Sequence, residues 1–306
     1  MPASYRAVAA AVALWVAVLV PVAAHAQTRS RADWLALAKS GFAVPAGRSA
    51  AALLVEMNPL LASPDPALRD DVAFTAGEKW IVRERLVPPD DLRRLMALWS
   101  ANLADGLGSQ GDDRVFKRSF SALSLSLVAA REVATPFLRA AEAQHLFDRL
   151  LDYFQRERDL RGFDATHGWM HSVAHTADAF KFLARGTHWV PGNLPRLLEA
   201  IRAKIDSSDV VFVWGENDRL ALALQSAVRR PDADLPAVEA WCTRWVAAHT
   251  ALWASGPQVN PGQFARVENA KQLLRSLHAA LSMESAPTPQ GESARTTVLA
   301  ALARMR

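Results

Sequence analysis

Apolar residues in this chain recur at the spacing of one helix face, and this periodicity limits the possible fold more than any other feature. Segments 146–154 and 267–281 place large apolar residues at intervals of three and four positions. Such spacing is typical of amphipathic helices. Strand-forming residues are scarce, since the chain holds only three Ile and two Tyr. The pattern predicts an all-α protein.

Prolines in the sequence stand at expected helix starts, each near a capping residue, as in Asp65-Pro66 and Thr135-Pro136. For 210–213, a strand and a buried loop both remain open. Short links between about a dozen helices indicate an irregular array of antiparallel helix pairs, a HEAT-like α-α superhelix. We expect helices near 31–39, 49–61, 66–86, 90–105, 113–131, 136–157, 167–184, 194–205, 216–229, 236–254, 263–283 and 292–304.

Three sequence regions define the expected domain organisation. Segment 7–24 is apolar throughout, follows Arg6, and ends in the small residues of a cleavage site. We therefore expect residues 1–26 to be a signal peptide cleaved after Ala26, with an uncleaved anchor as the alternative. Residues 27–284 are expected to form one helical domain, and residues 285–306 a flexible link and a short C-terminal helix. A periplasmic or secreted protein without a membrane span follows.

The charge pattern argues against a nucleic-acid partner. The 35 Lys and Arg residues nearly balance 31 Asp and Glu residues, for a formal charge of +4, and they are scattered along the chain. A nucleic-acid surface needs a basic stripe. The lone Cys242 excludes an internal disulfide and a cysteine-based zinc ribbon, and its apolar neighbours predict a packing role.

Segment 106–111 matches the G-x-G-x-x-G string of dinucleotide-binding loops. It follows an expected helix instead of a strand, so the motif lacks its structural context. A helix end and a turn are the better interpretation.

One cluster of polar residues has the residue types of a metal or catalytic site. His171, His175 and Asp178 are spaced i, i+4 and i+7, which places them within about 60° on one helix face. Two imidazoles and a carboxylate suit a divalent metal such as zinc. The alternative is that they are ordinary hydrogen-bonded residues of a helix surface. Trp169 and Phe180 would lie on the opposite, buried face.

Further polar residues are candidates to support this face. Glu157, Asp159 and Arg161 lie a short loop away in sequence, and Glu216 opens a later helix. They would either orient the imidazoles or form a salt-bridged helix end. We expect at least one of the four within reach of the histidines, because buried polar groups need partners.

Three stretches of this sequence form a recognisable pattern. They are 113–121 (DRVFKRSFS), 157–163 (ERDLRGF) and 168–178 (GWMHSVAHTAD), with weaker matches at 68–71, 216–220 and 269–277. In these residues the chain resembles the DUF2785 family of bacterial proteins of unknown function. The resemblance implies an all-helical domain and no established activity. His167 falls at a variable position of the pattern, which weakens it as a ligand.

Two functions therefore remain open. The first is a binding or scaffold protein whose polar groove takes a protein or peptide partner, since the sequence contains no complete catalytic signature. The second is a metal-dependent hydrolase that uses His171, His175 and Asp178. The first is preferred, because three ligands on a single helix need help from another element.

Overall fold

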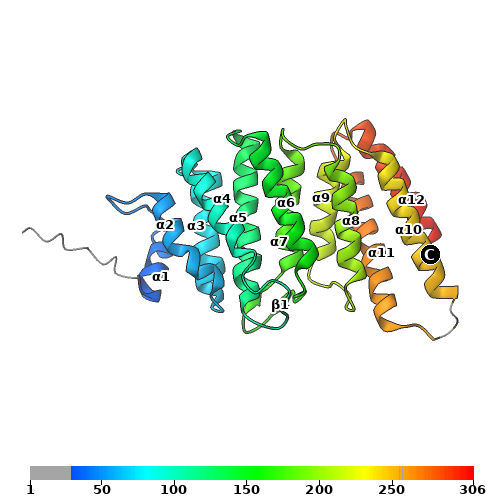
Figure 1. The fold of residues 1–306 in the computed structure, drawn as a ribbon, viewed down its shortest axis with the longest axis horizontal. Coiled ribbons are helices and arrows are strands. Elements are labelled where there is room, and N and C mark those ends of the chain that lie inside the picture. Colours follow the sequence, from blue (N-terminus) through cyan, green and yellow to red (C-terminus); the bar gives the residue numbers. More distant parts are fainter. Residues whose placement is uncertain (1–28, 255, 257) are drawn as a thin grey trace, which may run out of the picture.

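A computed structural model describes residues 29–254, 256 and 258–306. Helices follow one another in a row along the long axis of the molecule, which confirms the all-α class (Figure 1). In chain order the elements are α1 (Arg31–Lys39), α2 (Ala50–Met57), η1 (Asn58–Ala62), η2 (Ala67–Phe74), α3 (Thr75–Gly77), η3 (Glu78–Arg83), α4 (Pro89–Asn102), α5 (Arg114–Ala134), α6 (Ala140–Arg156), β1 (Phe163–Asp164), β2 (Gly168–Trp169), α7 (Ser172–Arg185), α8 (Asn193–Asp206), α9 (Glu216–Val228), α10 (Leu235–Ala254), α11 (Pro261–Ser282) and α12 (Pro289–Arg304).

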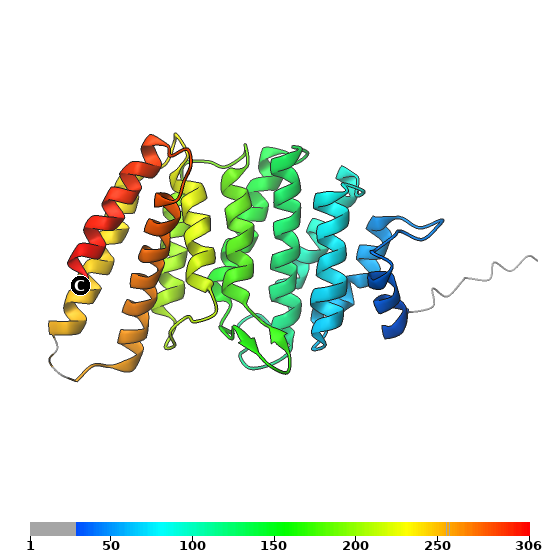
Figure 2. The ribbon, with the colours of Figure 1, turned by 180° about the vertical axis from the view of Figure 1, so that it is seen from behind.

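The helices from α4 onward form two layers of antiparallel pairs. Helices α5, α7, α9 and α11 pack side by side in one layer, while α4, α6, α8 and α10 form the other. The reverse view shows the same row from behind (Figure 2). Each pair joins one helix of each layer, and successive pairs stack in a row.

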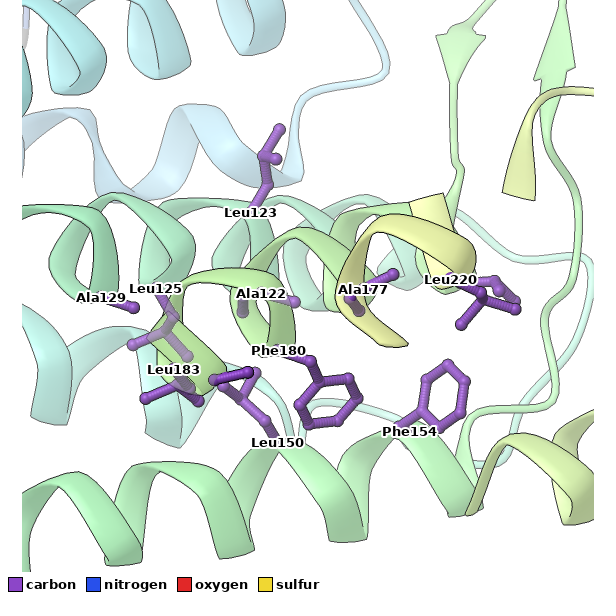
Figure 3. Packing of buried hydrophobic residues seen from close by; sticks show 14 of the residues in the cluster. Ala122, Leu123, Leu125, Ala129, Leu150, Phe154, Ala177, Phe180, Leu183 and Leu220 are labelled. Carbon is purple, nitrogen blue, oxygen red and sulfur yellow. The ribbon is translucent and has the colours of Figure 1, made fainter. Parts of the chain in front are cut away.

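Helix α7 lies in the middle of the array and is buried on all sides over 172–180. Phe180 stands edge-on to Phe154 of α6, with ring centroids 5.6 Å apart (Figure 3). Ala177 of the same helix is also fully buried, and its small side chain allows neighbouring helices to approach closely. Burial of one such phenylalanine contributes about 1.5–3 kcal/mol.

Segment 66–86, predicted as one regular helix, is wound more loosely. Elements η2 and η3 make π-helical turns on either side of the short α3. Within η2, Arg69 is fully buried, and its guanidinium lies over the rings of Phe116 and Phe120 at 4.2 and 4.7 Å. It also donates to the carbonyl of His167, so this segment braces a loop about a hundred residues away.

The helix predicted over 167–184 begins later, at Ser172, because the residues before it form a hairpin. Strands β1 and β2 pair antiparallel, with Phe163 opposite Trp169. The Asp164 carboxylate accepts two backbone N–H groups of the turn, and Gly168 adopts a φ of +71°. A side-chain-stabilised turn with a left-handed glycine competes successfully with the helix here.

Residues 210–213 form a loop, so the strand alternative is wrong. The side chain of the fully buried Asn269 replaces a strand partner. Its Oδ1 accepts from Phe212 N at 2.7 Å, and its Nδ2 donates to Val210 O at 2.9 Å. Segment 106–111 is a turn after α4, as expected, with left-handed backbone at its three glycines.

The C-terminal helix belongs to the array. Helix α12 begins at Pro289, three residues earlier than predicted, and packs against α10 and α11. Its Val298 is fully buried in the common core. Cys242 is buried in α10, as predicted, and burial raises the pKa of its thiol to about 12.

The predicted signal peptide, residues 1–26, lies outside the described residues. Among the helices that the structure describes, none is both long and apolar enough to cross a bilayer.

Candidate functional site

Two loops along one edge of the array, at the ends of the central helices α6–α9, enclose the candidate site. Loop 157–164, which enters the hairpin, and loop 207–216, which leads into α9, line a cleft of about 620 Å³. The hairpin lies midway along the array, at the lower edge of the ribbon views (Figures 1 and 2). The helices behind the loops are rigidly packed, so the loops present their side chains from a fixed frame.

Three aromatic side chains gather beside this cleft, and we call them the aromatic cluster: Phe163, Trp169 and Trp214. They are 36, 37 and 44% exposed. Phe163 lies 4.8 Å from Trp169 and 5.5 Å from Trp214, measured between ring centroids. Gly162 permits this arrangement, because a Cβ at that position would lie 2.1 Å from Cδ1 of Trp214.

His171 sits between the aromatic cluster and the core. It precedes α7 in a left-handed conformation, with φ +48°, so it lies outside the helix in which we predicted it. Its ring stacks on Trp169 at 4.7 Å and meets His175 edge-on at 5.4 Å. Burial is the main cause that lowers the pKa of His171 to about 4, with a smaller contribution from the Arg219 cation. The imidazole is therefore neutral at pH 7.

His175 is held by a hydroxyl from the neighbouring helix α5. Its Nδ1 lies 2.7 Å from Ser119 Oγ, and that hydroxyl also donates to the carbonyl of Met170. Ser119 Oγ therefore accepts a hydrogen bond from the protonated Nδ1 of His175. Burial, followed by the proximity of His171, lowers the pKa of His175 well below its usual value. The serine hydroxyl is fully enclosed, so the pair positions α7 against α5 instead of presenting a nucleophile.

Asp178 is occupied by two cations. Its Oδ1 accepts from Lys181 at 2.9 Å, and its Oδ2 accepts from Arg219 of α9 at 2.7 Å. Over the residues that the structure describes, no three His, Cys, Asp or Glu side chains are grouped so that they could hold a metal ion. Of the predicted set, His171 and His175 are in contact. The third member, Asp178, is instead engaged in ion pairs with Lys181 and Arg219.

Of the predicted supporting residues, Glu157, Asp159 and Arg161 brace the first loop. Glu157 is buried and paired with Arg118 of α5 through two bonds of 2.5 and 3.0 Å. Asp159 binds Arg161 and accepts from the backbone N–H of Gly111 at 2.9 Å. These contacts match a salt-bridged loop, and none of them reaches an imidazole.

Glu216 is the supporting residue that does approach the histidines. Its Oε1 lies 4.0 Å from Nε2 of His171, and its Oε2 accepts from the backbone N–H of Trp214 at 2.9 Å. The side chain lines the cleft and is 3% exposed. Burial raises the pKa of Glu216. Nε2 of His171 is also buried, and it has no hydrogen-bond partner among the described residues.

The expected polarity of α7 needs one correction. Trp169 does not lie on a buried face opposite the histidines, because it stands on β2 and stacks on His171. Of the alternatives left open for the histidines, exposure on the helix surface does not occur, since His171 and His175 are each 8% exposed. His167 is in the hairpin turn, with Nδ1 3.1 Å from the Asp164 carboxylate.

Sequence reasoning missed three contributors to the site. Trp214 and Phe163 complete the aromatic cluster, and Arg219 neutralises Asp178. A usable signal was present, since an aromatic residue beside a glycine occurs in each cleft segment: Gly162-Phe163, Gly168-Trp169 and Trp214-Gly215.

The fold and the cleft define a class of protein: an α-helical array of antiparallel pairs with a cleft built by two loops along one edge. The model of the DUF2785 family, described as a protein of unknown function, matches residues 103–279. The chain belongs to this family. No curated protein and no solved structure matches it significantly.

Proposed function

We propose that this protein is a binding protein whose cleft takes an extended peptide segment of a partner. The observation that carries the proposal is the cleft of about 620 Å³ beside an exposed aromatic cluster. Exposed tryptophans grouped beside a concavity are typical anchors of protein interfaces. An extended peptide offers both apolar side chains and backbone groups, which suits the mixed lining of this cleft.

The polar groups of the site favour binding over catalysis. A general base works best when its pKa lies near the working pH, yet the pKa of His171 is about 4. Asp178 is held between Lys181 and Arg219, which leaves it unsuited to ligate a cation. His171 supports the aromatic cluster through its stacking on Trp169.

Selection of random dodecapeptides displayed on phage against the folded protein tests the proposal. Binders should depend on the aromatic cluster, so Trp214→Ala should weaken the selected peptides at least tenfold. The matched control is Trp253→Ala, since Trp253 is exposed on α10, far along the chain from the cleft. Peptides that bind both variants equally well, or a library that yields none, would refute the proposal.

We further propose that the protein is exported, on the strength of the apolar segment 7–24 and the small residues that follow it. Cleavage after Ala26 should leave a mature chain that begins at Gln27. Intact-mass measurement on protein recovered from the periplasm or medium tests this. A chain that still carries Met1 would favour the anchor.

A further inference from the structure

The cleft contains a carboxylate whose burial is not compensated by a cation. Glu216 is 3% exposed, and no Lys or Arg among the described residues forms an ion pair with it. The nearest basic group is His171, 4.0 Å away, and its low pKa keeps it neutral. A buried charge without a partner costs several kcal/mol, so such a group either takes up a proton or is paired with a counterion.

The position of Glu216 at the start of α9 accounts for the hydrogen bond of only one of its carboxylate oxygens. Oε2 accepts from the backbone N–H of Trp214, and the first turn of a helix favours a negative charge. The carboxylate also interacts with its own backbone N–H, but Oε1 receives no hydrogen bond from another described residue, and the side chain lines the cleft. One carboxylate oxygen is therefore available to a ligand.

Other charges on the lining are largely neutralised. Arg161 is paired with Asp159 at 2.7 Å, and Asp209 is paired with Arg266 at 2.6 Å. Asp164, the remaining carboxylate of the lining, is partly exposed and contacts His167, so Glu216 is the buried charge that a ligand would meet. Arg158, the remaining cation of the lining, is exposed to solvent, where its field is screened.

Aromatic side chains line the same cleft as Glu216. Trp214 is two residues before Glu216 and lines the cleft together with Phe163. A ring face attracts a cation within about 6 Å, and it also packs well against an alkyl chain. A ligand group that combines a long apolar stem with a cationic end matches both features.

We infer that the cleft accepts a lysine or arginine side chain of a peptide, with its stem against Phe163 and Trp214 and its cation on Oε1 of Glu216. This inference rests on the proposed peptide-binding function and adds the chemical class of the residue recognised. Charge complementarity selects this occupant, because an acidic or purely apolar side chain would leave the carboxylate uncompensated.

Four peptides of the form Ac-Ala-Ala-Xaa-Ala-Ala-amide test the inference, with Lys, Arg, norleucine or Glu at Xaa. Binding is followed by chemical-shift changes of the full-length mature protein. The Lys and Arg peptides should bind about tenfold more tightly than the norleucine peptide, as expected for a hydrogen bond to a charged group. Butylammonium alone should bind more weakly than the Lys peptide, since it lacks the backbone.

Substitution of the carboxylate provides the second arm. Glu216→Gln keeps the acceptor for Trp214 N–H, so the variant should fold, and it should lose the preference for Lys over norleucine. The control Asp218→Asn changes an exposed carboxylate of the same helix, which binds Ser276, and should keep that preference.

The outcomes distinguish failure of this inference from failure of the proposed peptide-binding function. Equal binding of the Lys and norleucine peptides, or tighter binding of the Glu peptide, would overturn the inference and leave peptide binding intact. A preference for Lys that survives in Glu216→Gln would also overturn it. Failure of all four peptides to bind would count against both proposals.

Discussion

His171 combines a left-handed backbone with a buried, neutral imidazole. Its pKa is lowered from 6.5 to about 4, mainly by burial, so the unfolded chain binds a proton more readily than the folded one. The stability that the neutral imidazole provides is complete above pH 6.5 and is lost as the pH falls toward 4.

His171→Asn should therefore reduce the acid sensitivity of the protein. Asn tolerates the left-handed conformation and does not titrate in this range. Between pH 7 and pH 4, we expect the variant to lose on the order of 2–3 kcal/mol less unfolding free energy than the parent. Urea denaturation at the two pH values measures this difference. The control His145→Asn alters an exposed residue and should lose as much unfolding free energy as the parent. An equal loss in His171→Asn and in the parent would contradict the argument.

At the residue scale, the sequence spacing predicted one part of the site, the contact between His171 and His175. His171 and His175 come into contact because the residue before a helix occupies nearly the position that one more helical residue would have. The fate of Asp178 was not predictable from spacing. Its partner Arg219 is 41 residues away, and only the packing of α9 against α7 brings the two together.

The hairpin and loop 207–216 form the elements of the cleft, and their contact depends on Gly162. Gly162→Ala would place a Cβ 2.1 Å from Cδ1 of Trp214, so the indole must move. We expect a loss of about 1–3 kcal/mol in unfolding free energy, as for other overpacked sites. Gly192→Ala is the matched control, because no atom lies within 4 Å of its added Cβ.

Denaturation followed by far-UV circular dichroism measures both glycine variants. The Gly162→Ala protein should also show an altered tryptophan emission, since Trp214 leaves its contact with Phe163. Equal stability of the two variants would show that the loop adapts without cost.

At the element scale, long helices were predictable and the short hairpin was not. The predicted bounds of 31–39 match α1, and those of α9 and α10 differ by one residue at one end. A strand of two residues has no periodicity to detect. Its formation depends on the Asp164 turn and on pairing with β2, both of which arise in tertiary context.

At the scale of the whole molecule, the packing of α12 extends the array to the C-terminus. The segment before it looked like a linker because of its prolines and glycine. Pro289 and Gly291 instead lie in the first turn of the helix, and Thr288 Oγ1 accepts from Gly291 N at 3.1 Å. Proline is favoured at that position, so the same residues suit a helix start. The sequence analysis predicted only the link, and it placed the start of the helix three residues too late.

Val298→Asp tests whether α12 is part of the common core. Val298 is fully buried, and a carboxylate there should cost about 3–5 kcal/mol or detach the helix. The neighbouring Leu299→Asp is the control, because Leu299 is 47% exposed and its substitution should change stability by no more than about 0.5 kcal/mol. Urea titration monitored by circular dichroism distinguishes them. Similar midpoints for the two variants would mean that α12 contributes little to the array.

The burial of α7 between its neighbours has a consequence for how the molecule folds and locally unfolds. Arrays of repeats often fray from their ends, because each unit contacts only its neighbours. Helix α7 acquires its packing only when both α5 and α9 are docked, so the middle of the array is its cooperative centre. The two cleft loops belong to the adjacent units α6–α7 and α8–α9. A ligand that spans both loops links these two units. Its binding should therefore slow amide hydrogen exchange in α7 and α9 relative to the free protein.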